Sequence, residues 1–140
     1  MKPIEYTNVL SVRDYEKLRK AVGFKVLSLR QMERALKNQA YLVVAKIDDE
    51  TVGMVRLIFD GSYIAVLVDV IVLPQYQRQG IGRELMGKVL SYLKNSLVEG
   101  EQILVLLMAA KDKEGFYEKF GFIKRPDETY GAGMSQWLVK

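Results

Sequence analysis

The sequence of 140 residues contains no cysteine and no histidine. Without cysteine, the chain can form no disulfide, offer no thiolate to a metal ion and use no cysteine nucleophile. Without histidine, it cannot use a serine-histidine-aspartate triad, a histidine-based zinc site or a histidine general base. We therefore expect no metal site, and any chemistry must use tyrosine, carboxylates, lysine, hydroxyl groups or the backbone.

Long apolar runs and clusters of basic residues are also missing. The longest apolar stretch, residues 64–73, is interrupted by Asp69 and is about half of the ~20 residues that a membrane helix needs. The N-terminal residues lack the apolar core of a signal peptide, so we expect a cytoplasmic protein with no membrane partner. The net charge of +4 is scattered, which favours a phosphate-bearing ligand over nucleic acid. The length predicts a single domain over residues 1–140.

The first half of the chain predicts two helices and four strands. Helical spacing of apolar residues follows Ser11 and Ser28, which predicts two N-capped helices that end near Val22 and Asn38. β-Rich runs bounded by turn residues predict strands at Ile4–Val9, Tyr41–Ile47, Thr51–Phe59 and Tyr63–Leu73.

The second half predicts a β-α-β unit. Apolar residues recur every four positions from Ile81 to Leu97, which indicates an amphipathic helix that Gly100 ends. The apolar run Ile103–Met108 is typical of a buried strand, parallel to the strand before the helix. The remaining expected elements are a short helix, about Asp112–Phe120, and two closing strands, near Phe122–Arg125 and Met134–Val139. The predicted fold is α+β, with a mixed, mostly antiparallel sheet, a central parallel β-α-β unit and flanking helices.

The stretch from Val70 to Arg83 is the most informative part of the chain. A β-branched run stops at Pro74, passes through a polar turn and enters a helix through Gly80-Ile81-Gly82. This order directs the free N–H groups and the positive dipole end of a helix past the end of a strand. Such an arrangement binds anions, most often phosphate.

Two other glycine-containing motifs fit less well. A dinucleotide fingerprint needs a third glycine at the position of Leu85. A P-loop needs a hydroxyl for magnesium at the position of Val89, and its lysine would fall inside the predicted helix. If the glycines served only a tight turn, the placement of Arg78 and Arg83 on either side of them would have no explanation.

The loop and a second motif together resemble the GCN5-related N-acetyltransferase (GNAT) family. The family motif Gln/Arg-x-x-Gly-x-Gly/Ala is similar to Gln77–Gly82, and its second signature, a tyrosine followed by x-x-x-Gly-Phe, is similar to Tyr117–Phe122. The motifs are separated by about 35 residues, as in the family, and the resemblance covers residues 53–122. The resemblance implies the acyl-CoA N-acyltransferase fold and acetyl-coenzyme A as cosubstrate.

The resemblance also implies roles for particular residues. The diphosphate of acetyl-coenzyme A would lie on the loop residues Gln77, Arg78, Gln79, Gly80, Ile81, Gly82 and Arg83. Its pantetheine arm would pair with the backbone of Val70, Ile71 and Val72, where an N–H would hold the thioester oxygen. Tyr117 would protonate the departing thiolate. Many family members carry an asparagine seven residues before this tyrosine, where this chain has Ala110, so that contact is lost.

Two proton transfers need partners. A primary amine with a pKa near ~10.4 is mostly charged at pH 7, so it must lose a proton before it attacks. Asp69 is the candidate base, acting directly or through water, but strand alternation turns it away from the side of Val70 unless a bulge re-aims it. A structural hydrogen bond is the alternative role. Because proton transfer from tyrosine to a thiolate is uphill by ~2 kcal/mol at ordinary pKa values, we expect the site to lower the pKa of Tyr117 or to couple transfer to thiolate departure.

The expected function is transfer of an acetyl group directly to a primary amine in a ternary complex, most simply a small amine. The segments Gly53–Arg56 and Asp69–Val72 are similar to the branch of the family that acts on arylalkylamines and lysine-like amines. One alternative is acetylation of peptide lysines or N-termini, and another is a non-catalytic module that binds or senses acyl-coenzyme A. The sequence does not distinguish among acyl donors, and it is compatible with a homodimer.

Overall fold

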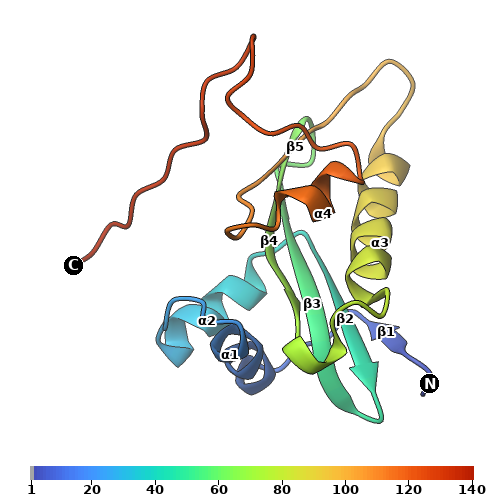
Figure 1. Ribbon diagram of the computed structural model, residues 1–140, viewed down its shortest axis with the longest axis vertical. Coiled ribbons are helices and arrows are strands. Elements are labelled where there is room, and N and C mark those ends of the chain that lie inside the picture. Colours follow the sequence, from blue (N-terminus) through green and yellow to red (C-terminus); the bar gives the residue numbers. More distant parts are fainter. Residues whose placement is uncertain (1) are drawn as a thin grey trace. The chain divides into compact units, whose positions relative to one another are not determined.

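The computed structural model describes residues 2–140 and divides the chain into two compact units, one ending at Leu106 and one covering Leu107–Lys140. The first unit contains three α-helices, the 3-10 helix η1 (Pro74–Tyr76) and the sheet as far as Leu106, and Figure 1 shows how they are arranged. Among these described residues, no helix is both long enough and apolar enough to cross a membrane.

The sheet has five strands in the order β1-β2-β3-β4-β5. The strands are β1 (Glu5–Thr7), β2 (Tyr41–Ile47), β3 (Glu50–Phe59), β4 (Ile64–Val72) and β5 (Leu104–Leu107). Each pair from β1 to β4 is antiparallel. The connection from β4 to β5 passes through a helix, as parallel neighbours require, so the sheet is mixed and the predicted β-α-β unit is confirmed.

Local sequence explains the ends of several elements. The turn between β2 and β3 uses Asp48 and Asp49, both with positive φ, which is the conformation of a two-residue hairpin turn. The Ser11 hydroxyl caps α1 (Val12–Ala21) by accepting from the Asp14 N–H at 3.1 Å. The Ser28 hydroxyl caps α2 (Leu29–Lys37) in the same way, so both predicted N-caps are confirmed.

The helices cover both faces of the sheet (Figure 1). Helix α3 (Ile81–Ser96) packs on the face that carries Gly53, where a Cβ on the glycine would meet the Leu85 side chain at 3.3 Å. Successive residues of a strand point to opposite faces, so Arg56 lies on the other face, where it contacts residues of α1 and α2. The core therefore has two layers, one on each side of β3 and β4.

Three predicted details differ from the structure. Helix α3 ends at Ser96 instead of near Gly100, because the Ser96 hydroxyl binds the Leu93 carbonyl at 2.6 Å and Leu97 turns to extended backbone. Helix α4 covers only Glu114–Glu118.

The two closing strands predicted near 122–125 and 134–139 are wrong, since no strand follows β5 in the described chain. Most of the apolar side chains that suggested them are exposed, with Ile123 at 76% and Leu138 at 87%, and a β-rich pattern forms a strand only where it finds a partner.

Candidate functional site

Strand β4 carries a bulge at the position where the sequence placed the acetyl slot. Met54 of β3 pairs with Ile71 and Arg56 pairs with Val68, so Asp69 and Val70 together stand opposite a single residue of β3. Asp69 adopts a left-handed backbone conformation with φ 51°. The sequence interpretation left the side-chain direction of Asp69 dependent on such a bulge.

Among the described residues, no strand pairs with the outer edge of β4 at its bulged end, which we call the open edge. The Leu73 N–H donates to the Val52 carbonyl on β3 at 2.8 Å, and backbone groups alternate between the two edges of a strand. The backbone N–H and C=O groups of Val72 and Val70 therefore point away from β3. The Val72 carbonyl accepts from the side-chain amide of Gln77 at 2.9 Å. Strand β5 has four residues and begins beside Tyr63, so it does not extend along this end of the nine-residue β4.

The carboxylate of Asp69 is the centre of a buried polar network. Its Oδ1 atom accepts from Arg19 Nη1 at 2.8 Å, and its Oδ2 atom accepts from Arg56 Nε at 2.9 Å and from the Tyr15 hydroxyl. The side chains of Asp69 and both arginines are only 8–10% exposed. Asp69 therefore makes structural hydrogen bonds, which was the alternative to its role as a base; the role as a base stays a prediction.

Tyr15 is buried beneath this carboxylate, with 1% of its surface exposed. Burial and the hydrogen bond to Asp69 raise the pKa of Tyr15 to about 12 from its ordinary value of 10.0. Its ring also lies 5.6 Å from the guanidinium carbon of Arg19 and 5.5 Å from that of Arg56. The phenol therefore stays protonated at neutral pH and serves as a donor to Asp69.

The sequence interpretation missed Tyr15, Arg19 and Arg56 as site residues. Their partner Asp69 is 54, 50 and 13 residues away along the chain, a distance over which no local pattern applies. One signal was available: Arg56 interrupts the otherwise apolar run of residues 52–59, and a buried arginine needs an anionic partner.

The loop before α3 has the features of an anion site. Arg78 and Gly80 have positive φ, at 62° and 87°, and such left-handed residues turn successive N–H groups toward one side. In the described chain, none of the backbone N–H groups of residues 78–83 donates to a protein acceptor. The exposed side chains of Arg78 and Arg83 flank them. The residues grouped by sequence as a phosphate loop, Gln77 to Arg83, therefore lie together at the start of α3.

Gly53 determines how closely this helix approaches the sheet. A Cβ at position 53 would lie 3.0 Å from the Ile71 carbonyl oxygen and 3.4 Å from the Ile81 side chain. Contacts this short do not occur without movement, so only glycine lets the first turn of α3 pack directly on β3 and β4. Because Gly53 has no side chain, α3 can start close to the sheet, and the free N–H groups of the loop lie beyond the end of β4.

The predicted acid, Tyr117, belongs to the second unit. It lies in α4, is 9% exposed and makes edge-to-face contacts with Phe116 and Phe122. Burial raises the pKa of the Tyr117 phenol above its ordinary 10.0. The expectation that the site lowers this pKa is therefore wrong. Of the two routes considered, proton transfer coupled to departure of the thiolate remains.

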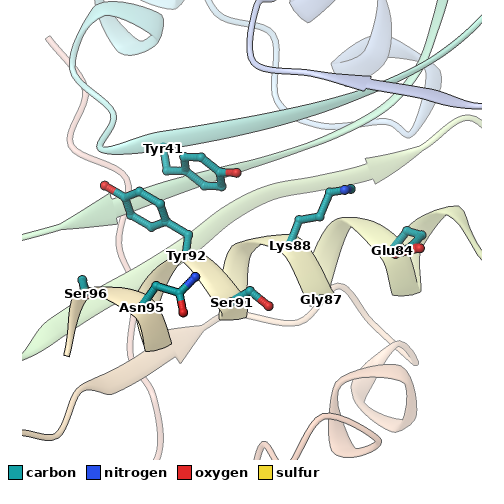
Figure 2. Close-up of a pocket in the computed structure, with 8 residues that line it drawn as sticks. All are labelled: Tyr41, Glu84, Gly87, Lys88, Ser91, Tyr92, Asn95 and Ser96. Carbon is teal, nitrogen blue, oxygen red and sulfur yellow. The ribbon is translucent and has the colours of Figure 1, made fainter. Parts of the chain in front are cut away.

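The first unit also carries two hollows. The larger, of about 760 Å³, runs along the exposed side of α3, where the rings of Tyr41 and Tyr92 stack with centroids 4.1 Å apart (Figure 2). A smaller one of about 400 Å³ borders the loop at Tyr76 and Gln79. The described residues contain no group of three or more acidic side chains that could hold a metal ion.

Comparison with known proteins gives consistent matches over almost the whole chain. A family model described as an acetyltransferase (GNAT) domain matches residues 9–137. The N-acetyltransferase ycf52 of Porphyra purpurea, described as uncharacterized, is 30% identical over 129 residues, covering 89% of this chain and 72% of that protein.

Solved structures match as well. A probable acetyltransferase from meticillin-resistant Staphylococcus aureus, described as a protein of unknown function, is similar with a TM-score of 0.87 and 31% identity, covering 97% of this chain and 100% of that one. A GNAT family acetyltransferase from Streptococcus pneumoniae is similar with a TM-score of 0.78 and 32% identity, covering 100% of this chain and 99% of that one.

Proposed function

This chain belongs to the GNAT family of N-acetyltransferases, and on that premise we propose that it transfers the acetyl group of acetyl-coenzyme A directly to a primary amine in a ternary complex. The observation that carries the proposal is the loop of unpaired N–H groups at the start of α3, beside the bulged and open end of β4. The absence of cysteine supports direct attack by the amine over a thioester on the enzyme.

The loop residues Gln77 to Arg83 would hold the diphosphate of the cosubstrate. Among the described residues, the N–H groups of residues 78–83 have no protein acceptor, and the positive end of the α3 dipole adds to their attraction for an anion. Arg78 and Arg83 would supply charge-assisted hydrogen bonds from either side. Bound acetyl-coenzyme A would supply an activated acyl group and a thiolate leaving group.

The open edge of β4 would hold the pantetheine arm. The backbone groups of Val70 and Val72 face this edge, whereas those of Ile71 face β3, so we assign the contacts to Val70 and Val72. The Val70 N–H follows the bulge directly and is our candidate donor to the thioester oxygen. A fixed donor at this position would stabilise the negative charge that develops on the oxygen during attack.

Tyr117 would donate the proton that the thiolate takes up. Its raised pKa keeps the phenol protonated at neutral pH but makes it a weak acid. Proton donation would therefore accompany cleavage of the carbon–sulfur bond, as the charge on sulfur develops. The proton lost by the amine would pass to Asp69 or to water; the donors around Asp69 support a positioning role for this carboxylate.

The acceptor would be a small primary amine, and a peptide amine is the alternative. A screen for thiol release from acetyl-coenzyme A, with arylalkylamines, polyamines and lysine peptides, tests both, and mass spectrometry identifies the product. We expect thiol release and an acetylated small amine. Release with peptides alone would favour the alternative, and binding without release for any amine would indicate a non-catalytic module.

A matched pair of variants ties the activity to this site. Arg78→Ala combined with Arg83→Ala should weaken acetyl-coenzyme A binding by about tenfold, because two flanking cations are lost. Arg13→Ala combined with Arg30→Ala removes the same charge from exposed positions on α1 and α2 and should leave the affinity unchanged.

A further inference from the structure

The network around Asp69 joins parts of the first unit that lie far apart in the sequence. Asp69 is in the bulge of β4, Arg56 is in β3, and Tyr15 and Arg19 are one turn apart in α1. Each of the three partners donates to the same carboxylate. The Asp69 side chain therefore holds the bulge of β4 in place against β3 and α1.

Each arginine also extends the network to a helix end or a loop. Arg19 donates through Nη2 to the Lys25 carbonyl at 2.7 Å, in the segment that joins α1 to α2. Arg56 donates through Nη1 to the Ala35 carbonyl at 3.0 Å, in the last turn of α2. The Ala35 carbonyl also accepts from the Asn38 N–H at 3.1 Å, and a cation at this end of a helix complements the helix dipole.

The charges of the network depend on one another. Two guanidinium groups meet one carboxylate, all at most 10% exposed, so loss of Asp69 would leave two like charges buried side by side. The left-handed backbone of Asp69 is itself unfavourable for most residues, and it persists only where the surroundings hold it. The ion pairs thus stabilise the conformation that places Val70 in the bulge.

From this geometry we infer that Asp69, Arg19 and Arg56 are positioning residues, which hold the Val70 N–H in the orientation that receives the thioester oxygen. The inference rests on the proposed function and deepens it. It assigns Asp69 a role through the backbone of its neighbour instead of a role as proton acceptor. Arg19 and Arg56 then contribute to turnover without touching either substrate.

The variant Asp69→Asn separates the charge from the backbone. Asparagine adopts left-handed conformations more readily than most residues, so it keeps the bulge accessible while removing the negative charge. Arg19→Met removes one cation and keeps most of the apolar stem of the side chain. Asp14→Asn is the matched control, since Asp14 is a part-buried carboxylate that accepts from the Thr51 hydroxyl and takes no part in the network.

Amide resonances in nitrogen-15 NMR spectra provide a readout that needs no amine acceptor. In the wild type, acetyl-coenzyme A should shift the Val70 amide further than coenzyme A, which has no acetyl carbonyl, and both should shift Gly80. In Asp69→Asn and Arg19→Met, Gly80 should still respond, and the extra shift at Val70 should disappear. Asp14→Asn should behave as the wild type.

Combining the two variants tests whether Asp69 and Arg19 act on Val70 through the same bulge. If both residues act through the bulge, the double variant should lose no more of the Val70 signal than either single variant. An unchanged Val70 response in Asp69→Asn would overturn the inference. If Asp69→Asn does not fold, Arg19→Met and Tyr15→Phe carry the test with the same readout. Failure of Gly80 to respond in the wild type would instead contradict the proposed function.

Discussion

Arg56 on β3 and Asp69 on β4 form a buried ion pair, with 2.9 Å between Nε and Oδ2, at the point where β4 bulges. The register of the two strands shifts beside this pair, so that two residues of β4 face one of β3. The pair lies on the face covered by α1 and α2, whereas the loop of free N–H groups begins the helix on the opposite face. On one face, the ion pair thus holds the bulged end of β4. On the other face, this end adjoins the loop Gln77–Arg83.

Replacing Gly80 by alanine should weaken acetyl-coenzyme A binding. Gly80 has φ 87°, and a side chain in this conformation costs about 1–2 kcal/mol, which the loop can avoid by changing its backbone. Gly100→Ala is the control, because Gly100 has φ 90° and lies in a turn after α3. Both variants should melt at lower temperature, but calorimetry should show weaker binding only for Gly80→Ala; equal affinities would contradict the role of the loop backbone.

Replacing Gly53 by alanine should destabilise the fold. The new Cβ on β3 would lie 3.0 Å from the Ile71 carbonyl oxygen, so β3 must move away from β4 and α3, at a cost of about 1–3 kcal/mol. Gly87→Ala is the opposite case, since Gly87 is exposed within α3 with no atom near its new Cβ, and it should gain about 0.5–1 kcal/mol. Urea unfolding measures both; a Gly53→Ala variant as stable as the wild type would show that the contact relaxes freely.

Replacing Tyr117 by phenylalanine should separate turnover from binding. Loss of the phenol removes the proposed proton donor and should lower turnover by ~10²–10⁴-fold, while acetyl-coenzyme A affinity stays nearly unchanged. Tyr63→Phe changes an exposed tyrosine directly before β4 and should leave both turnover and affinity unchanged. Thiol release and calorimetry on the same preparations provide the comparison. Wild-type turnover in Tyr117→Phe would exclude this residue as the acid.

Alkaline pH should destabilise the protein through Tyr15. Its pKa is about 12 in the folded state against 10.0 for an unperturbed tyrosine, chiefly because of burial and then because of Asp69. A group whose folded pKa is raised contributes stability that is fully present below pH 10 and is lost as the pH rises toward 12.

Tyr15→Phe should therefore be less stable than the wild type at neutral pH, because Asp69 loses a donor, yet should lose stability less steeply above pH 10. Urea unfolding followed by circular dichroism across this range measures the two slopes. Parallel curves would show that folding does not shift the pKa of Tyr15, which would contradict the account.

Local patterns predicted the parts of the fold that neighbouring residues determine. The serines at positions 11 and 28 cap their helices as expected, and β2 and β3 form at the expected strands on either side of a short turn. The loop from Gln77 to Arg83 could be predicted because its glycines and its helix are contiguous in sequence. The left-handed conformation of Gly80, with φ 87°, was not predicted from the sequence.

Features that depend on distant residues could not be predicted in the same way. The partners of Asp69 come from α1 and β3, and only the folded chain brings them together. The apolar pattern near 134–139 resembles a strand, but strand formation depends on a partner that the pattern does not specify, and these side chains are exposed. The raised pKa of Tyr117 likewise follows from burial, which the motif around it does not reveal.

Isothermal titration calorimetry of acetyl-coenzyme A into the purified wild-type protein tests the central claim most directly. If the residues from Gln77 to Arg83 hold the diphosphate, one molecule should bind per chain, and Arg78→Ala combined with Arg83→Ala should weaken it by about tenfold. No heat of binding in the wild type, or an affinity indifferent to both arginines, would contradict the account.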